Sequence, residues 1–514
     1  MHGCRGSVLL IASEPKKCGS LAVGCFFVRE LISSYPRGHR TSLRTASKTR
    51  IVINRNHRDG SRRRIGSSSV SMAAFAVSIL SAALSPPHSG FHMRGRKRGF
   101  EGWYSRLALP DSRVDFAFIY SVFDGADPQS ARHGVGMQVI GPNARISRSK
   151  PLSDGFWADE HELALGFTSF GLKAKKLMAP RAFERFVSEG FQLTSTLHQG
   201  ALSDGSASWS YRIEPRLGWG GEWGVDKQYS TAGWLAALPV FEPHYQVLMA
   251  HGVATGHVCW HGERFEFAGA PVYSEKNWGG QFPSKWFWLQ CNTWCSVDGY
   301  EQSDGNDESS EESSEESGNG RGDGVSGSRG LGGIISLTCA GGRRGVPIVG
   351  EEEVAMIALH TEEDLGGATN GRFHPFPNVR WTMGPWGCWR AEGSFEEMRV
   401  LIEASCDPAA DPGVLVAVPT AEGMVDGSRE TFEGKLRVRM WRCNDEGGRQ
   451  RDSPAATGGE TLLVDAHSVR CALELGGGPW EHAWQGECKV NDLARAVLSA
   501  DPPLERIRDR LPGY

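Results

Sequence analysis

The chain has 514 residues, a formal net charge of -4, 39% hydrophobic residues and 23% charged residues. These values predict a globular protein of two or three domains and give no reason to expect nucleic acid as a partner. Its 12 cysteines include no CxxC pair, which excludes a disulfide framework and indicates reduced thiols in a non-secretory compartment. The sequence has no P-loop, nucleophile elbow or HExxH motif, so serine and zinc hydrolysis lack support.

Residues 1–86 are rich in Arg, Lys and Ser and contain only three acidic residues, Glu14, Glu30 and Asp59. This composition predicts an organelle transit peptide. Two alternatives remain open: a disordered basic tail, or a true start at Met72 with an artefactual upstream part. The apolar run at 72–84 is too short to span a bilayer.

Residues 87–297 are expected to form an N-terminal β-domain. Short runs rich in β-branched and aromatic residues at 115–123, 133–141, 245–260 and 264–273 are separated by Gly, Pro, Asn or Asp. This pattern is typical of antiparallel sheets and barrels. Residues 334–490 contain similar runs, which predict a second β-domain in tandem with the first.

Two further segments differ in composition from these β-domains. Residues 298–333 are acidic and rich in Ser and Gly, which predicts a disordered insert, with the RGD triplet in it a chance match. Residues 491–514 are expected to form a helical tail, in which Leu504, Ile507 and Leu511 share one face. That face could pack against a barrel or lie on a membrane surface.

The segment YSEKNWGGQFPSKWFWLQCN, at 273–292, carries the densest group of candidate site residues. Side chains alternate along a strand, so two apolar faces are expected at 285–291, one of them lining a cavity. The predicted faces are Trp286, Trp288 and Gln290 against Phe287, Leu289 and Cys291, with Tyr273, Glu275 and Asn277 sharing a face in the preceding strand.

Two other segments place acids beside imidazoles. Asp159 and His161 share a face in FWADEHEL, and Glu242 and His244 share one in FEPHYQV. With Glu275, these groups could converge in an all-β interior, where burial keeps a carboxyl protonated and able to donate a proton. The structural alternative for each is a strand-end ion pair or a hydrogen-bonded core group.

A metal site has only weak sequence support. His257, Cys259 and His261 would share one strand face, and such a trio could bind zinc. A fourth ligand with recognisable spacing does not follow, so we expect no metal.

A long series of blocks, in order from 87 to 484, resembles the tocopherol cyclase family of plants, algae and cyanobacteria. The acidic insert is foreign to the plant pattern, and Thr382 and Cys388 stand where Glu and an aromatic residue are usual. The blocks include PHSGFHMRG, FEGWYSRLALP, FWADEHELALG, STAGWLAALPVFEPHYQVLMAHGVATG, ERFEFAGAPVYSEKNWGGQFPSKWFWLQCN, NVRWTMGPWGCW and ALELGGGPW.

This resemblance implies a cofactor-independent cyclisation in plastids, at plastoglobules. The substrates would be 2,3-dimethyl-6-phytyl-1,4-benzoquinol and 2-methyl-6-phytyl-1,4-benzoquinol, and the products γ- and δ-tocopherol. Peripheral association with plastid lipid droplets or membranes is expected. YSEKNWG is also distantly similar to a motif of carotenoid 1,2-hydratases, which implies an all-β fold of two tandem lipocalin-like antiparallel barrels.

The expected site residues follow from this chemistry. Glu275 is the expected proton donor, with Tyr273 beside it. His244, oriented by Glu242, is expected to accept or relay the phenolic proton, and Asp159 with His161 is the second candidate pair. The aromatic and amide groups expected to bind the substrate or stabilise a cation are Trp103, Tyr104, Asn277, Trp278, Trp286, Trp288 and Gln290.

Two other functions remain open from the sequence. A hydratase acting on an isoprenoid would share the protonation step but admit water, and it would yield a tertiary alcohol. A non-catalytic lipocalin-like carrier of prenylquinols would need the cavity but no acid.

Overall fold

The computed structural model describes residues 89–94, 98–109, 111–124, 133–151, 155–169, 176–222, 231, 236, 242–295, 333–346, 350–364, 369–420, 423–443 and 459–490. The predicted leader at 1–86, the predicted tail at 491–514 and the predicted insert at 298–333, except its last residue, lie outside these ranges. All described strands belong to one compact unit.

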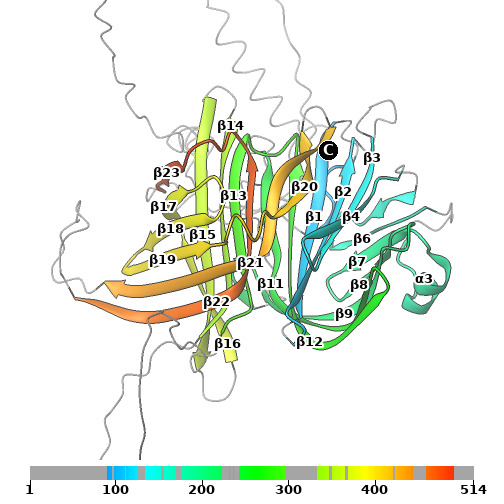
Figure 1. Cartoon of the computed structure of the whole chain (residues 1–514), viewed down its shortest axis with the longest axis horizontal. Helices are drawn as coiled ribbons and strands as arrows, with labels where there is room; N and C mark the ends of the chain where they lie inside the picture. The colour runs from blue at the N-terminus through cyan, green and yellow to red at the C-terminus, as the bar shows by residue number, and fades with distance from the viewer. Residues whose placement is uncertain are drawn as a thin grey trace, which may run out of the picture. The chain divides into compact units, whose positions relative to one another are not determined.

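Twelve strands form the first sheet, in the order β4-β3-β2-β1-β12-β11-β9-β8-β7-β6-β5, with β10 paired to β9 (Figure 1). All of its ladders are antiparallel. One helix, α3 (Pro180–Phe186), lies between β6 and β7. The strands are β1 (Phe100–Leu109), β2 (Val114–Phe123), β3 (Gly134–Gly141), β4 (Arg145–Ser149), β5 (Trp157–Ala158), β6 (Ala164–Thr168), β7 (Gly190–Thr194), β8 (Leu197–Ala201), β9 (Ala207–Gly218), β10 (Gly221–Glu222), β11 (His244–Trp260) and β12 (Glu263–Gly279).

Eleven strands form the second sheet, in the order β16-β15-β14-β13-β22-β21-β19-β18-β17-β23, with β20 paired to β21. It begins at Lys285, so the two sheets divide between β12 and β13. The strands are β13 (Lys285–Cys291), β14 (Ile334–Val346), β15 (Gly350–Asp364), β16 (Thr369–Phe376), β17 (Asn378–Met383), β18 (Cys388–Phe395), β19 (Met398–Ser405), β20 (Val414–Thr420), β21 (Gly423–Cys443), β22 (Glu460–Gly477) and β23 (Trp484–Cys488).

Each sheet curls around an apolar core of its own. In the second sheet the indole of Trp484 on β23 donates a 3.0 Å hydrogen bond to Glu353 on β15, which brings strands from the two ends of the sheet together. In the first sheet Ser149 on β4 bonds to Glu189, which precedes β7. The prediction of an all-β fold of two tandem lipocalin-like antiparallel barrels is confirmed, with each half formed by one large curled antiparallel sheet.

A third apolar cluster lies between the two sheets. It combines Ala117, Val247 and Tyr273 of the first sheet with Trp288 and Phe432 of the second. The interiors of the two curls are filled by separate sets of large side chains. Because close-packed interiors leave little free space, the contact region between the sheets is the place to look for a ligand site.

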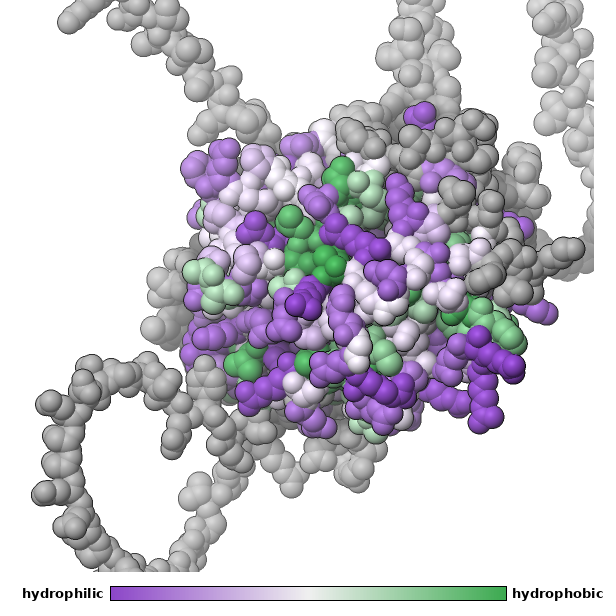
Figure 2. Space-filling view, turned by 45° about the vertical axis from the view of Figure 1, so that its right-hand side comes forward, coloured by the Kyte–Doolittle hydropathy of each residue, from purple (hydrophilic) through white to green (hydrophobic). Residues whose placement is uncertain are grey.

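The surface is mostly hydrophilic on the face drawn in Figure 2, where apolar side chains gather only in small patches. Across the described residues, large apolar side chains that remain exposed are few and include Leu415 (50%) and Val425 (40%). None of the helices formed by the described residues has the length and apolar character needed to cross a membrane.

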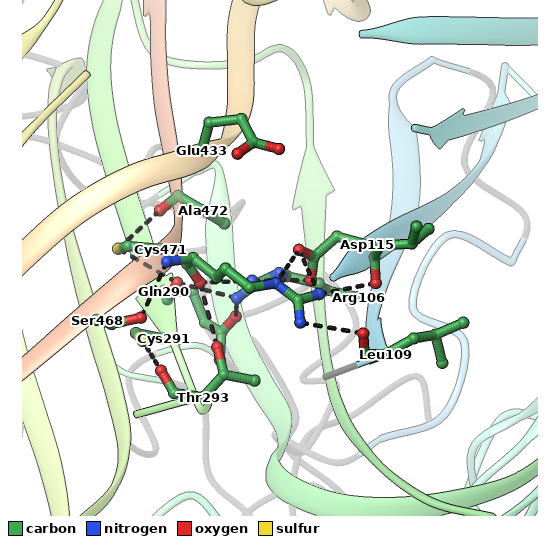
Figure 3. Close-up of polar contacts among 12 residues, drawn as sticks. Arg106, Leu109, Asp115, Gln290, Cys291, Thr293, Glu433, Ser468, Cys471 and Ala472 are labelled. Atoms are coloured by element: carbon green, nitrogen blue, oxygen red, sulfur yellow. Dashed lines mark hydrogen bonds and ion pairs between the residues drawn. The ribbon is translucent and has the colours of Figure 1, made fainter. Parts of the chain in front are cut away.

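A buried charge network ties the two sheets together (Figure 3). Arg106 on β1 donates to Asp115 on β2 at 3.0 Å and to the side-chain oxygen of Gln290 on β13 at 2.9 Å. Arg470 on β22 donates to the other oxygen of Asp115 at 2.7 Å. A buried charge is tolerated only when it is paired. This network therefore helps to fix the relative position of the two sheets where they pack together.

Candidate active site

A buried carboxylic acid lies at the interface between the sheets. Glu275 on β12 is 6% exposed, and its Oε2 atom accepts three hydrogen bonds. The hydroxyls of Tyr245 and Tyr273 donate at 2.6 Å each, and the indole N–H of Trp288 donates at 2.9 Å. Trp288 belongs to the second sheet, so both sheets build this cradle.

Strand alternation explains why these side chains meet. Tyr273, Glu275 and Asn277 share one face of β12, as predicted. On β11 the residue opposite Asn277 is Tyr245, which therefore points to the same face. On β13 the predicted separation of faces is also confirmed, because Trp288 packs between the sheets while Phe287 lies in the core of the second curl.

The surroundings of Glu275 leave a substantial fraction of its carboxyl protonated near neutral pH. Burial raises its pKa to about 7, against the opposing effect of the hydrogen bonds from Tyr245, Tyr273 and Trp288. Burial and the nearby Glu275 also raise the pKa of both tyrosines well above the usual value, so they stay neutral donors. Because all three donors converge on Oε2, they stabilise the carboxylate once the proton has left.

Two further glutamates face the same region from the second sheet. Glu430 on β21 and Glu474 on β22 are directly opposite each other in the ladder, and Glu474 is also opposite Trp288 on β13. The hydroxyl of Tyr104, the neighbour of Glu275 across the β1–β12 ladder, donates a 2.5 Å hydrogen bond to Glu430. Burial raises the pKa of both glutamates.

A cleft between the sheets exposes all three carboxyl groups to one space. Its cavity volume is about 80 Å³ and it is partly open to solvent, so it is smaller than a typical ligand pocket and would have to widen to admit a phytyl quinol. Its apolar walls come mainly from Phe100 and Phe282 and from residues 416–419 of β20. The side-chain amide of Gln138 on β3 holds that last wall, through bonds of 2.8 and 3.0 Å to the backbone of Ala417.

One glycine makes room for a predicted site residue. A Cβ atom at Gly476 would lie 1.9 Å from the indole of Trp286. The indole therefore packs directly over the β22 backbone, two residues from Glu474. It helps to hold the pKa of Glu474 below the value that burial alone would impose.

Some predicted substrate-binding residues lie at the cleft and others do not. Trp103, Tyr104 and Asn277 line it. Trp278 is on the opposite face of β12, stacked on His92 with 4.1 Å between ring centroids. Gln290 is part of the charge network with Arg106.

The predicted acid–imidazole pairs lie away from Glu275. Asp159 is in a turn after β5, where its carboxylate accepts the backbone N–H of His161 at 2.7 Å. Glu242 accepts the backbone N–H of Gly280 at 2.9 Å. His244 is opposite Trp278 in the ladder, which places it on the face of the sheet that Glu275 does not occupy. Neither pair lines the cleft.

The described residues offer no metal centre: no group of three or more His, Cys, Asp or Glu side chains in them is placed to hold an ion. Two members of the alternative zinc trio, Cys259 and His261, contact other side chains. Cys259 accepts a weak 3.7 Å contact from Arg264, and His261 sits in a turn beside Ser147.

Sequence reasoning missed Tyr245, Glu430 and Glu474. Glu474 lies in the apolar run ALELGGG, where an isolated acid is a usable signal, whereas Glu430 lies in the polar segment SRETFEG, which carries no such signal. Tyr245 reaches the site through its position opposite Asn277 in the β11–β12 ladder, which the sequence does not show. Thr382 and Cys388, where the sequence departs from the family pattern, do not line the cleft.

These features define an all-β enzyme class in which a buried carboxylic acid faces an apolar cleft between two curled sheets. The chain matches the family described as tocopherol cyclase-like over residues 97–300 and 330–477. It is 35% identical to the probable chloroplastic tocopherol cyclase of Oryza sativa subsp. japonica, covering 85% of this chain and 88% of that protein. It is 36% identical to the chloroplastic tocopherol cyclase of Zea mays, covering 83% and 85%.

The chain therefore belongs to the tocopherol cyclase-like family, and the predictions of family and of a cyclising enzyme are confirmed. Both relatives are named chloroplastic, which supports the predicted plastid localisation. Among solved structures, a putative AttH from Nitrosomonas europaea aligns with a TM-score of 0.34 at 11% identity, covering 77% of this chain and 99% of that chain.

Proposed function

We propose that this protein cyclises phytylated methylbenzoquinols to γ- and δ-tocopherol, with Glu275 as the proton donor. The observation that carries the assignment is the buried Glu275 carboxyl, with three donors on one oxygen, facing an apolar cleft. The curated relatives named tocopherol cyclase support the same reaction.

The reaction adds the O–H of a phenol across a trisubstituted alkene. Glu275 donates its proton to the alkene, positive charge develops on the tertiary carbon, and the phenolic oxygen closes the ring on that carbon. The cradle of Tyr245, Tyr273 and Trp288 stabilises the carboxylate that forms, which lowers the barrier to proton release.

Two aromatic rings lie close to this charge. Tyr104 and Trp288 meet edge to face, with 5.2 Å between ring centroids, beside Glu275. An aromatic face near a cation contributes about 0.5 to 2 kcal/mol, more when water is excluded. The apolar walls from Phe100, Phe282 and β20 limit the water that could trap the cation as an alcohol.

The phytyl tail must enter from a lipid phase. The exposed side chains of Leu415 and Val425 lie on β20 and β21, which supply one wall of the cleft. Peripheral contact of this hairpin with plastoglobule or thylakoid lipid would deliver the tail to the cleft directly.

Replacement of Glu275 by Gln tests the function. Full-length wild-type protein incubated with 2,3-dimethyl-6-phytyl-1,4-benzoquinol is expected to yield γ-tocopherol, identified by mass and chirality. Glu275→Gln is expected to bind the quinol but lose at least about 100-fold in kcat. A tertiary alcohol as product, or near-normal turnover by the variant, would overturn the proposal. Glu433→Gln, an exposed carboxylate on β21, is the matched control.

A further inference from the structure

Ring closure leaves a second proton to be placed. The quinol loses its phenolic proton as the carbon–oxygen bond forms, and Glu275 has by then given its own proton to the alkene. The residue predicted to accept the phenolic proton, His244, lies on the other face of the sheet from Glu275. The acceptor must instead be a group that faces the cleft.

We propose that Glu430 and Glu474 form a carboxylate dyad that shares one proton and accepts the phenolic proton of the substrate. The two residues are cross-strand partners in the β21–β22 ladder, and both line the cleft opposite Glu275. Side chains directly opposite each other in a ladder are close enough for strong interaction. The inference rests on the proposed function and adds the base to it.

The charges around the dyad support a single negative charge. Two carboxylates at one buried position cannot both ionise, so the pair carries at most one negative charge, and it can act as a base in that singly ionised state. The groups that face Glu430 are Glu474 and Glu275, which disfavour its ionised form, and Tyr104 and Arg106, which favour it. Burial raises the pKa of both glutamates, which makes the remaining negative charge a strong proton acceptor.

Tyr104 fixes one member of the dyad in place. Its hydroxyl donates to Oε1 of Glu430 at 2.5 Å, which leaves Oε2 of that carboxyl for the substrate or for Glu474. Tyr104 comes from the first sheet and Glu430 from the second. Because Tyr104 is also the ladder neighbour of Glu275, the acid and the dyad lie on two sides of one phenol.

The proton balance closes without an outside reagent. The Glu275 O–H bond and the phenolic O–H bond break, and a C–H bond and a C–O bond form. Glu275 ends as a carboxylate and the dyad ends neutral. One proton returns from the dyad to Glu275 before the next turnover, so the enzyme recovers its starting state with no oxidant or reductant.

The test compares Glu430→Gln and Glu474→Gln with wild type on two substrates: the natural dimethyl phytyl quinol and a ring-fluorinated analogue whose phenol loses its proton more easily. Each variant is expected to lower kcat about 100-fold on the natural quinol, with KM changed by less than about threefold. The fluorinated quinol is expected to recover at least about tenfold of that loss, because a more acidic phenol needs less help from a base. Glu275→Gln is expected to stay inactive on both substrates.

Several outcomes decide the matter. Activity within about threefold of wild type in both glutamine variants, or an equal loss on both quinols, would overturn the dyad. Near-ultraviolet circular dichroism reports whether each variant folds, and the second variant keeps the test usable if the first does not. Glu433→Gln serves as the control. A wild-type protein that makes no chromanol would refute the proposed function itself, whereas chromanol formation with unimpaired dyad variants would refute only this inference.

Discussion

Trp288 of the second sheet donates a 2.9 Å hydrogen bond from its indole to the carboxyl of Glu275 in the first sheet. The environment of Glu275 therefore depends on both sheets, because neither sheet alone supplies all three hydrogen-bond donors to its carboxyl. It predicts that a change in the second sheet alters an acid in the first.

Replacement of Trp288 by Phe is expected to shift the pH dependence of the reaction. Activity requires protonated Glu275, so it falls as pH rises through the pKa of about 7. Loss of a donor to the ionised form raises this pKa, so the alkaline limb of the kcat–pH profile moves to higher pH while kcat falls about tenfold. A profile that stays in place, or moves to lower pH, would contradict the assignment of that limb to Glu275.

The two tyrosines are expected to act together. Hydrogen bonds to a charged group are each worth about 1.5 to 3 kcal/mol, so Tyr245→Phe or Tyr273→Phe should lower kcat about 10- to 100-fold. Their hydroxyls lie 3.1 Å apart and share one acceptor atom, so the double variant should lose less than the product of the single losses. Single-turnover kinetics on all three proteins measures this coupling, and full additivity would argue against a shared role.

A buried ion pair on the other face of the first sheet is expected to support stability. Lys276 and Glu101 are fully buried and 2.6 Å apart. Glu101→Gln should lower the free energy of unfolding by about 3 to 5 kcal/mol, because it leaves the Lys276 charge without its counter-charge. The double change Glu101→Gln with Lys276→Met should recover much of that loss in a denaturant titration. A double variant as unstable as the single one would show that the pair is not the cause.

Acid is expected to destabilise the second sheet through its histidines. Burial lowers the pKa of His360 and of His374 to about 4 from 6.5. A lowered histidine pKa contributes stability that is present above the unfolded pKa of 6.5 and is lost as pH falls toward 4. His360 accounts for about 3 kcal/mol at most of this loss, and the less deeply buried His374 for less. Unfolding titrations between these pH values should show a shallower slope for His360→Asn, and an unchanged slope would exclude this residue as a cause.

The side-chain faces of β12 and β13 could be predicted from the sequence, whereas the contributions of the other strands could not, for a physical reason. Alternation along 273–292 depends only on neighbours in the chain, so the faces of Tyr273, Glu275 and Trp288 could be inferred. Tyr245 lies at the site because of the register between β11 and β12, and this register cannot be inferred from the residues of β11 alone. Glu430 and Tyr104 are 326 residues apart in sequence and meet only because two sheets pack face to face.

The same reason explains why the sequence could not show on which side of the strands a cavity lies. Apolar alternation shows that both faces of β13 are buried, but it does not show which face lies inside a curl and which meets the other sheet. The large side chains inside the curls, such as Trp209 and Trp381, occupy the space that a barrel interior would need for a phytyl chain.

The central claim is that catalysis occurs between the sheets at Glu275. A crystal structure of the full-length protein with a quinol whose first phytyl double bond is reduced would test it most directly. We predict the reduced carbon within about 3.5 Å of Glu275 Oε1, in the cleft lined by Phe100 and Glu430. A quinol bound inside either curl, with Glu275 out of reach of the phytyl chain, would contradict the account.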